Sequence, residues 1–295
     1  MTRERKFVGV ELGGTKSIAV LSAGDAIIEK VITATTTSDK TLDLLHHQLL
    51  AWQSQGPLNG LGIASFGPVR LNAQFEDYGA ILTTPKAGWT GARVLQRLGN
   101  GLDCPIAIDT DVNAAALAEY RWGAGQGCSS LVYLTIGTGL GGGVLIDGRP
   151  VHGRLHPEIG HILTRRAPGD AFAGACAFHG DCIEGLISGP ALARRFGTAA
   201  EALPPNAPQW DDVAHDLAQL LVTIIHTVAP QRILVGGGVG LGFGGLLASA
   251  TARLPALLGS YYSDLGPSQL SAMITAPLLG ADAGPLGSIA LAQIA

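Results

Sequence analysis

Charged residues are scarce in this chain of 295 residues. Asp, Glu, Lys and Arg together make up 14% of it and leave a formal net charge of -4, whereas an average domain is roughly 25% charged. The longest basic cluster is Arg3, Arg5 and Lys6 at the start. The sequence therefore lacks the positive footprint of a nucleic-acid-binding protein, and we expect no nucleic-acid partner.

Long apolar runs are also absent. No stretch approaches the ~18 uninterrupted apolar residues typical of a membrane helix, and a strand-like run follows the short charged start directly, which is unlike a signal peptide. Four cysteines do not form a disulfide framework in a chain of this length, and Cys104 and Cys128 are expected to be small core residues. These absences favour a cytoplasmic protein without a membrane partner.

Glycine, by contrast, is abundant. The 42 glycines are about twice the ordinary share, and several are clustered, which indicates backbone that approaches a ligand closely. The length exceeds the usual size of one domain, so two domains are expected.

The most specific pattern lies between Glu158 and Glu184. Three residues are spaced C-x2-H-x2-C, and a histidine precedes them. The four are His161, Cys176, His179 and Cys182. These residue types can complete a tetrahedral zinc site, and we expect zinc to stabilise a segment that has little core of its own and to position Glu158, His161 and Glu184. The alternative is four unrelated residues in a surface loop.

A glycine turn joins two apolar runs near the N-terminus, at 7–10 and 18–21. This pattern predicts a strand, a tight turn and a second strand. The turn offers backbone amides, a hydroxyl and an ammonium group to phosphate oxygens. These candidates are Gly13, Gly14, Thr15 and Lys16. Glu11 beside them could hold a hydrated magnesium ion. The spacing is not that of a P-loop, and a plain hairpin is the alternative.

Residues 131–146 repeat this layout around a second glycine turn. A duplicated α/β unit could grip one polyphosphate with a turn from each copy. Gly137, Gly139 and Gly142 match G-x-G-x-x-G, but a strand-like segment follows them in place of the helix that a dinucleotide fold requires.

A third glycine cluster, expected to form a turn at 236–240, follows a strand expected at 232–235. Gly240, Gly242 and Gly245 also fit G-x-G-x-x-G between a strand and a helix. An NAD-binding oxidoreductase is therefore an alternative function.

Acidic residues follow the strand expected at 106–108 and precede an Ala-rich helix expected at 114–122. Asp111 could accept a proton from a substrate hydroxyl, and Asn113 could orient that substrate. Asp109 is the second carboxylate of the group. The alternative is that Asp111 only caps the helix.

The other elements complete an α/β pattern. Trp89, in the turn-rich stretch 83–89, could stack on an apolar ring face or be a half-buried residue of a plain loop. Ser188 is expected to cap the helix that follows it. We expect strands at 27–32, 61–64 and 271–275, and helices at 41–52, 190–196, 211–228 and 283–295. The first of these helices is indicated by an apolar stripe at helical spacing, made of Leu42, Leu45, Leu49 and Trp52.

Together these motifs resemble the ROK family of sugar kinases, and within it the bacterial fructokinases. The resemblance covers essentially the whole chain. It rests on 11–16 as a first phosphate loop, 109–113 as a catalytic strand end, 136–143 as a second phosphate loop, Gly148 and Gly153 leading into Glu158-Ile159-Gly160-His161, and the zinc segment. Two further motifs favour fructokinase: Ser65-Phe66-Gly67-Pro68, and Thr84-Pro85-Lys86 with Gly88-Trp89.

The resemblance implies an actin-like ATPase fold of the α/β class, with two ribonuclease-H-like domains, a cleft between them and a homodimeric assembly. We expect an N-terminal domain at 1–112 and a C-terminal domain at 113–282 that carries a zinc-binding insertion at 156–184. The C-terminal helix at 283–295 is expected to pack back on the first domain. No helix-turn-helix segment precedes the kinase region, which argues against the repressor branch of the family.

Residue roles follow from the same resemblance. It implies Asp111 as general base and ATP, magnesium and zinc as cofactors, with zinc on the four residues named above and magnesium at Glu11. The sugar contacts are Gly67, Pro68, Asn113, Glu158, His161 and Glu184. The ATP contacts are Gly13, Gly14, Thr15, Lys16, Thr138, Gly139, Pro190, Gly236, Gly237, Gly238, Val239 and Gly240. Glu11 stands where many members have Asp, and Asp109 where Glu is common.

The expected reaction is phosphorylation of D-fructose by ATP to D-fructose 6-phosphate. Glucose, mannose and N-acetylmannosamine are alternative sugars, and a non-catalytic sugar sensor on the same fold is an alternative function.

Overall fold

The computed structural model describes residues 5–242 and 245–295, and the chain divides into two compact units. Unit 1 contains the chain up to Gln126 together with Gly148–Pro157 and Leu279–Ala295, and unit 2 contains Gly127–Asp147 and Glu158–Leu278. This division differs from the expected boundary at residue 112, because the helix that follows Asp111 packs within unit 1.

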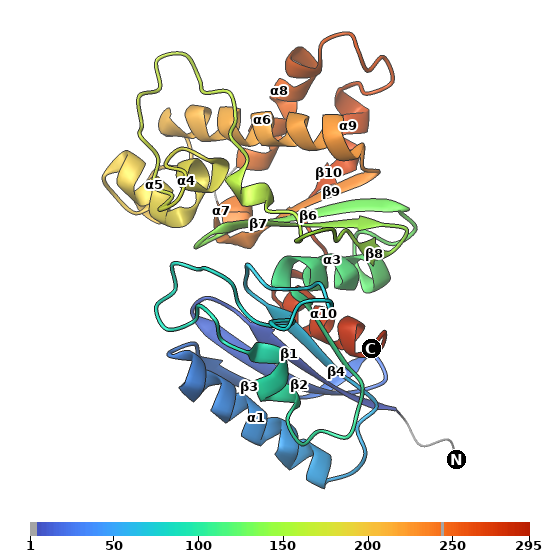
Figure 1. Cartoon of the computed structure of the whole chain (residues 1–295). Helices are drawn as coiled ribbons and strands as arrows, with labels where there is room; N and C mark the ends of the chain where they lie inside the picture. Colours follow the sequence, from blue (N-terminus) through green and yellow to red (C-terminus); the bar gives the residue numbers. More distant parts are fainter. Residues whose placement is uncertain (1–4, 243–244) are drawn as a thin grey trace. The chain divides into compact units, whose positions relative to one another are not determined.

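Unit 1 is built on a five-stranded sheet in the order β3-β2-β1-β4-β5 (Figure 1). Its elements are β1 (Lys6–Leu12), β2 (Lys16–Ala23), β3 (Ala26–Ala34), α1 (Ser38–Ser54), β4 (Leu61–Ser65), α2 (Val94–Gly99), β5 (Ile106–Thr110), α3 (Asp111–Trp122), β8 (Arg149–Pro150), the 3-10 helix η3 (Gly280–Asp282) and α10 (Ala283–Ala292).

The two faces of β1 are covered by different helices, as the alternation of its side chains requires. Val8, Val10 and Leu12 share a core with the apolar stripe of α1, whereas Phe7 packs with Ile289 of α10. α1 and α10 therefore lie on opposite faces of the sheet (Figure 1).

Three strands of this sheet end at one edge. β1, β4 and β5 are parallel neighbours, with Leu12 opposite Ser65 and Ser65 opposite Thr110. Because parallel strands bring their carboxyl ends to the same edge, the loops that follow them converge there. This edge collects the first glycine turn, the 66–69 loop and Asp111.

Unit 2 contains a sheet in which four strands follow the order β10-β9-β6-β7. β6 and β7 are antiparallel, and β9 lies parallel to β6, so the hairpin and its parallel neighbour repeat the arrangement of β2, β1 and β4. Its elements are β6 (Ser130–Ile136), β7 (Leu140–Ile146), η1 (Ile159–His161), α4 (Ile183–Ile187), α5 (Gly189–Phe196), η2 (Ala200–Ala202), α6 (Gln209–Val228), β9 (Arg232–Gly236), α7 (Gly237–Gly242), α8 (Leu246–Leu258), α9 (Pro267–Met273) and β10 (Ile274–Thr275).

Two sequence-based expectations on elements of unit 2 are wrong. The glycine cluster after β9 forms the short helix α7 in place of a turn, and only its first residue, Gly237, has a positive φ, of 85°. The strand expected at 271–275 is limited to Ile274 and Thr275, because residues up to Met273 continue α9. In the described part of the chain, no helix is both long and apolar enough to span a membrane.

Candidate active site and metal centre

The first glycine turn projects from the sheet edge of unit 1 and is open to solvent. Gly13 N donates to Lys16 O at 3.1 Å, which closes the turn, and Gly14, Thr15 and Lys16 are exposed. The Lys86 ammonium donates to Gly14 O at 2.5 Å, so a second cation reaches the same turn. The turn thus presents free backbone and two ammonium groups, as a phosphate site requires.

Glu11 lies at the end of β1, on the face that α10 covers. A Cβ on Gly284 would lie 2.2 Å from the Glu11 Oε1 atom, so the missing side chain leaves room for the carboxylate. Burial raises the pKa of Glu11, and the charges of Lys16 and Lys30 oppose this shift. A partly buried carboxylate beside positive charge offers the oxygen ligands that a divalent cation prefers.

Asp111 begins α3 directly after β5, but it does not cap the helix. The cap is Thr110, whose side chain accepts from Asn113 N at 3.2 Å, so the alternative role for Asp111 is wrong. The Asp111 Oδ1 atom accepts from Val112 N at 2.9 Å. This contact orients the carboxylate at the edge where the parallel strands end.

Asp109 is the buried centre of a polar cluster beside Asp111. It is 2% exposed. Its Oδ1 atom accepts from Thr110 N and Asn113 Nδ2, both at 2.7 Å, and its Oδ2 atom lies 2.9 Å from His152 Nε2. The hydrogen bond to Asp109 raises the pKa of His152 against the opposing effect of burial.

The loop after β4 also reaches this edge. Gly67 and Pro68, expected to contact sugar, are joined by a cis peptide bond, and Pro68 O accepts from Leu82 N at 2.8 Å. The next amide, Val69 N, donates to the buried His156 Nε2 at 3.1 Å. This bond needs a neutral imidazole, and burial accordingly lowers the pKa of His156.

Trp89 does not line a site. Its side chain is completely buried, its Nε1 donates to Thr36 O at 2.8 Å, and its ring meets Phe66 edge to face. Both expectations for Trp89 are wrong, and its role is to fix the 83–89 loop against the core of unit 1.

The second glycine turn, in unit 2, is tied to Glu184. The carboxylate Oε2 atom accepts from Leu140 N at 3.0 Å, and a Cβ on Gly139 would lie 2.9 Å from the same oxygen. Thr138, at the tip, is exposed. Glycine at position 139 therefore allows the turn and the Glu184 carboxylate to lie against each other.

Other residues expected to bind ATP gather around this turn. Gly189 N, at the start of α5 and next to Pro190, donates to Gly137 O at 2.7 Å. Gly237 approaches the end of β6 so closely that a Cβ would lie 2.4 Å from Ile136 O. The structure thus brings the turn, the start of α5 and the start of α7 together within unit 2.

Glu158 precedes η1 and is exposed on unit 2. The surrounding protein nevertheless removes water from its carboxyl, and this desolvation raises the pKa of Glu158 to about 7. Repulsion from the Glu184 carboxylate adds to the shift. Glu158 and Glu184, far apart in sequence, therefore influence each other electrostatically. Gly160 brings η1 against β7, since a Cβ there would lie 2.0 Å from Leu140 O.

The four expected zinc ligands converge, which contradicts the alternative of unrelated residues. Their ligand atoms all lie within 4.8 Å of one another. His161 Nδ1 lies 3.5 Å from Cys182 Sγ and 3.8 Å from Cys176 Sγ, and the latter lies 3.8 Å from His179 Nδ1. Tetrahedral zinc with ordinary Zn–S and Zn–N bonds separates its ligands by roughly 3.3–3.8 Å, so the donor set fits zinc.

Backbone geometry makes this convergence possible. Cys176 and Gly180 exchange two hydrogen bonds of 3.0 Å, which fold the chain back around His179, and Gly180 takes a φ of 65°. Burial, with a further contribution from Cys176, raises the pKa of the Cys182 thiol to about 11. A bound cation would reverse this shift, because a coordinating thiol is deprotonated.

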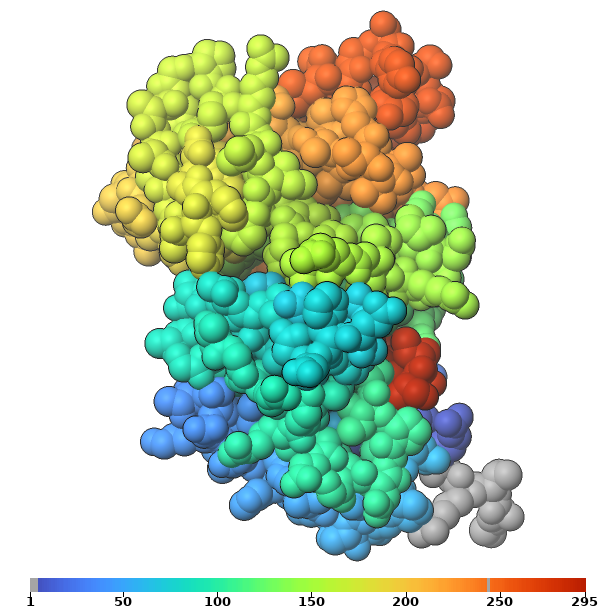
Figure 2. Space-filling view, in the orientation of Figure 1, coloured from blue at the N-terminus to red at the C-terminus, as the bar shows by residue number. Residues whose placement is uncertain are grey.

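The remainder of the metal segment is anchored by a buried ion-pair network. Arg195 of α5 is 5% exposed and donates to Asp170 Oδ2 and Asp216 Oδ2, each at 2.8 Å, and Arg166 also pairs with Asp170. Much of the segment from 162 to 182 lies on the surface of unit 2 (Figure 2, yellow-green). This network joins the surface segment to the helical core.

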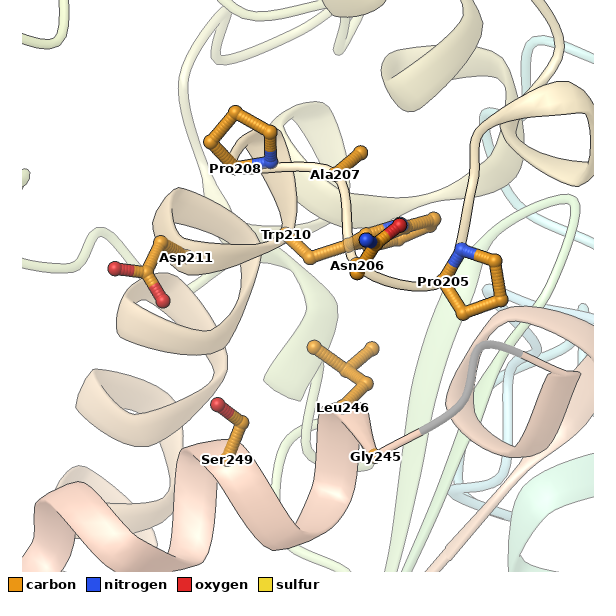
Figure 3. Close-up of a pocket in the computed structure, with 9 residues that line it drawn as sticks. All are labelled: Pro205, Asn206, Ala207, Pro208, Trp210, Asp211, Gly245, Leu246 and Ser249. Atoms are coloured by element: carbon orange, nitrogen blue, oxygen red, sulfur yellow. The ribbon is translucent and has the colours of Figure 1, made fainter.

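A cavity of about 450 Å³ lies elsewhere in unit 2, between the chain entering α6 and the start of α8 (Figure 3). Its lining includes Asn206, Trp210, Asp211, Leu246 and Ser249. None of the residues expected to bind sugar, ATP or metal lines it. The last position of the third glycine pattern, Gly245, does, whereas residues 243 and 244 lie outside the described residues.

Sequence reasoning assigned no role to three residues that the structure places in these clusters. They are Lys86, which belongs to the motif Thr84-Pro85-Lys86, and the histidines His152 and His156. No local spacing links position 152 to position 109, or 156 to 69, so only the folded chain reveals these contacts.

Comparison with known proteins gives a consistent result over the whole chain. The model of the ROK family matches residues 7–295. The fructokinase of Zymomonas mobilis is 39% identical over an alignment of 304 positions, which covers 100% of this chain and 99% of that protein. Among solved structures, the ROK hexokinase of Thermus thermophilus has a TM-score of 0.77 at 26% identity and 98% coverage of both chains. A ROK family glucokinase from Streptomyces griseus, in complex with glucose and AMPPNP, has a TM-score of 0.75 at 26% identity, covering 98% of this chain and 100% of that one.

Proposed function

This chain belongs to the ROK family and is an ATP-dependent sugar kinase with the actin-like ATPase fold, and from that premise we propose that it phosphorylates D-fructose to D-fructose 6-phosphate. The observation that carries the choice of sugar is the 39% identity with a fructokinase over the full length of the chain. Glucose is the second candidate, because the Streptomyces griseus relative was solved with glucose bound. Mannose and N-acetylmannosamine follow.

Asp111 is the general base of this proposal. Its carboxylate takes the proton of the sugar's 6-hydroxyl while that oxygen attacks the γ-phosphorus of ATP, and the bond from the γ-phosphorus to the bridging oxygen breaks to release ADP. Its place at the carboxyl end of β5, with Thr110 serving as helix cap, supports this role. A general base typically contributes about 10²- to 10⁴-fold.

The sugar contacts proposed in unit 1 are Gly67, Pro68 and Asn113, and those in unit 2 are Glu158, His161 and Glu184. A polyol needs several hydrogen-bond partners, and carboxylates and amides supply them. The raised pKa of Glu158 suits a group that exchanges water for sugar hydroxyls.

The ATP contacts proposed are Gly13, Gly14, Thr15 and Lys16 on the first turn, Thr138, Gly139 and Pro190 around the second, and Gly236, Gly237, Gly238, Val239 and Gly240 at the start of α7. Phosphoryl transfer depends mainly on positioning and charge neutralisation. Exposed amides and ammonium groups, including Lys86 at the first turn, supply both.

Magnesium and zinc are the metals of this proposal. Glu11 would hold hydrated magnesium, which supplies positive charge to the phosphate oxygens when bound. His161, Cys176, His179 and Cys182 would hold zinc in a structural role. We also propose that the protein is cytoplasmic and forms a homodimer.

An ADP-release assay with a panel of sugars tests the proposed function. We expect ATP-dependent turnover with D-fructose to exceed turnover with D-glucose, D-mannose and N-acetyl-D-mannosamine. Asp111→Asn should still bind ATP and sugar but lose about 10²- to 10⁴-fold in kcat, because its amide cannot accept the proton. Asp103→Asn, which changes an exposed carboxylate before β5, is the matched control and should behave as wild type.

Three outcomes would count against these assignments. Sugar binding without turnover in the wild type would favour the sensor function. A preference for another hexose would remove fructose. Near-normal turnover in Asp111→Asn would remove Asp111 from the role of base.

A further inference from the structure

The side chain of Asn113 has a buried acceptor without a partner. Asn113 is 1% exposed, and its Oδ1 atom makes no hydrogen bond within the described residues. Leaving a buried carbonyl oxygen unpaired costs about 1–3 kcal/mol, so such an atom in a native protein calls for an explanation. It lies on the first turn of α3, two positions after Asp111.

The opposite end of the same amide is fixed. Asn113 Nδ2 donates to Asp109 Oδ1 at 2.7 Å, and a carboxylate oxygen can only accept. If the amide were turned over, two oxygens would face each other at this distance. The charge of Asp109 therefore decides which end of Asn113 is the acceptor that remains unpaired.

Asp109 in turn depends on His152. The carboxylate is 2% exposed, and of its two oxygens Oδ1 already serves Thr110 N and Asn113 Nδ2. The Oδ2 atom lies 2.9 Å from His152 Nε2. His152 comes from the segment after β8, far from Asp109 in sequence but within the same unit.

We propose that Asp109 and His152 are positioning residues, which together hold the Asn113 amide so that its Oδ1 atom accepts a hydrogen bond from a hydroxyl group of the sugar. This inference rests on the proposed function and adds to it: it fixes the polarity of one sugar contact and names two residues that act on the sugar without touching it. The substrate must accordingly present a hydroxyl donor at this point.

Loss of the histidine would release this arrangement by a defined chemical route. Without this partner the buried Oδ2 atom of Asp109 has lost its hydrogen bond, and the carboxylate can turn about its Cβ–Cγ bond toward another donor. The Oδ1 atom then no longer holds the nitrogen of the Asn113 amide, so the orientation of that amide is no longer fixed. The amide could then present its NH₂ group to the substrate, where it meets the wrong partner.

Two substitutions at position 152 separate positioning from bulk. His152→Phe keeps the ring shape but has no donor, whereas His152→Gln keeps a donor near Nε2. We expect His152→Phe to raise the KM for D-fructose by about tenfold or more, as loss of one buried hydrogen bond would, with kcat and the KM for ATP within about twofold of wild type. His152→Gln should recover most of the affinity.

A double-mutant cycle with Asn113 tests the route of action. Because His152 is proposed to act through Asn113, His152→Phe should add little to the increase in KM that Asn113→Ala causes alone. His47→Phe, the same change at an exposed position of α1, is the matched control. Thermal midpoints of all variants show whether each is folded.

The outcomes distinguish this inference from the proposed function. Suppose that wild type phosphorylates a hexose. The positioning role is then wrong, and the function stands, if His152→Phe has the same KM for that hexose as wild type. The same holds if the increases in KM caused by His152→Phe and Asn113→Ala multiply in the double variant. Equal losses for sugar and ATP would likewise assign His152 a structural role. If wild type phosphorylates no sugar, the proposed function fails, and this inference fails with it.

Discussion

The Glu158 carboxyl lies in surroundings that disfavour its charge. Nearby protein and the Glu184 carboxylate raise its pKa from 4.5 to about 7, so the folded chain holds this proton more tightly than the unfolded chain does. Stability is therefore lost as the pH rises from 4.5 to about 7, and the loss is complete above that window. A substrate-binding role would explain why such a cost is retained.

Glu158→Gln tests this cost, because a glutamine has no charge to disfavour. Above about pH 7, we expect the variant to be more stable than wild type and to unfold at a higher temperature. The gain in the free energy of unfolding should not exceed about 1 kcal/mol, because solvent screens an exposed carboxyl. Below pH 4.5 the two should unfold alike. Calorimetry across this range is the measurement, with Glu201→Gln, another exposed glutamate of unit 2, as control. A stabilisation that does not change with pH would contradict the assignment.

Single residues show where sequence reasoning about the site succeeds and where it stops. Asp111 could be identified because a carboxylate after a buried strand is a local pattern. His152 could not, since its contact with Asp109 depends on how two distant segments meet. Trp89 was misjudged because an aromatic residue in a turn-rich stretch has the same local pattern whether its ring faces solvent or the core.

At the scale of elements, the C-terminal helix α10 depends on glycines that allow close approach. A Cβ on Gly287 would lie 2.3 Å from the carbonyl carbon of Ala114 in α3, and a Cβ on Gly62 in β4 would lie 1.9 Å from Ser288 O. These contacts are backbone to backbone, so a larger side chain cannot be accommodated by a rotamer change. The helix is thereby placed beside both β4 and the helix that carries Asp111.

Gly287→Ala should therefore destabilise unit 1. We expect a loss of about 1–3 kcal/mol, typical of overpacking in a closely packed interior, measured by chemical unfolding. Gly242→Ala in α7 is the control, because a Cβ there meets nothing within 4 Å and alanine favours a helix by about 1 kcal/mol over glycine. If both variants lose stability equally, the close approach of α10 and α3 is not what limits position 287.

Elements with strong periodicity were predictable, and glycine-rich ones were not. The stripe of Leu42, Leu45, Leu49 and Trp52 predicted α1, and all four are buried in the core of unit 1. The cluster 236–240 was expected to be a turn because glycine disfavours helices, yet it forms α7. Packing against the end of β6, which requires Gly237, outweighs that local preference.

At the scale of the whole molecule, the two units share one arrangement of strands and differ in the segments that are added to it. The repeated glycine hairpins in the sequence indicated this duplication, and both hairpins pair as expected, β1 with β2 and β6 with β7. The assignment of residues 113–126 and 148–157 to unit 1 could not be read from the sequence. The first depends on the packing of α3 against α10, and the second on contacts such as those of His152 with Asp109 and of His156 with Val69. The metal segment is an addition that belongs to unit 2 alone.

This distribution predicts that zinc stabilises one unit more than the other. The four ligands lie in unit 2, and metal binding to a folded site adds directly to its folding free energy. Cys176→Ala should reduce zinc from about one ion per chain to a trace, since a structural site needs all four ligands, and should weaken sugar binding, because His161 and Glu158 lose their support.

Calorimetry and metal analysis together test this expectation. Unfolding of Cys176→Ala should separate into two transitions, because only unit 2 loses a cross-link. Protease sensitivity of the 162–182 segment would assign the earlier transition to unit 2. Cys104→Ala, which removes a partly buried thiol of unit 1, should keep its zinc and a single transition. Removal of zinc from the wild type with a chelator should reproduce the unfolding profile of Cys176→Ala. If the zinc-free wild type keeps its stability and its sugar affinity, the four side chains converge without serving a metal.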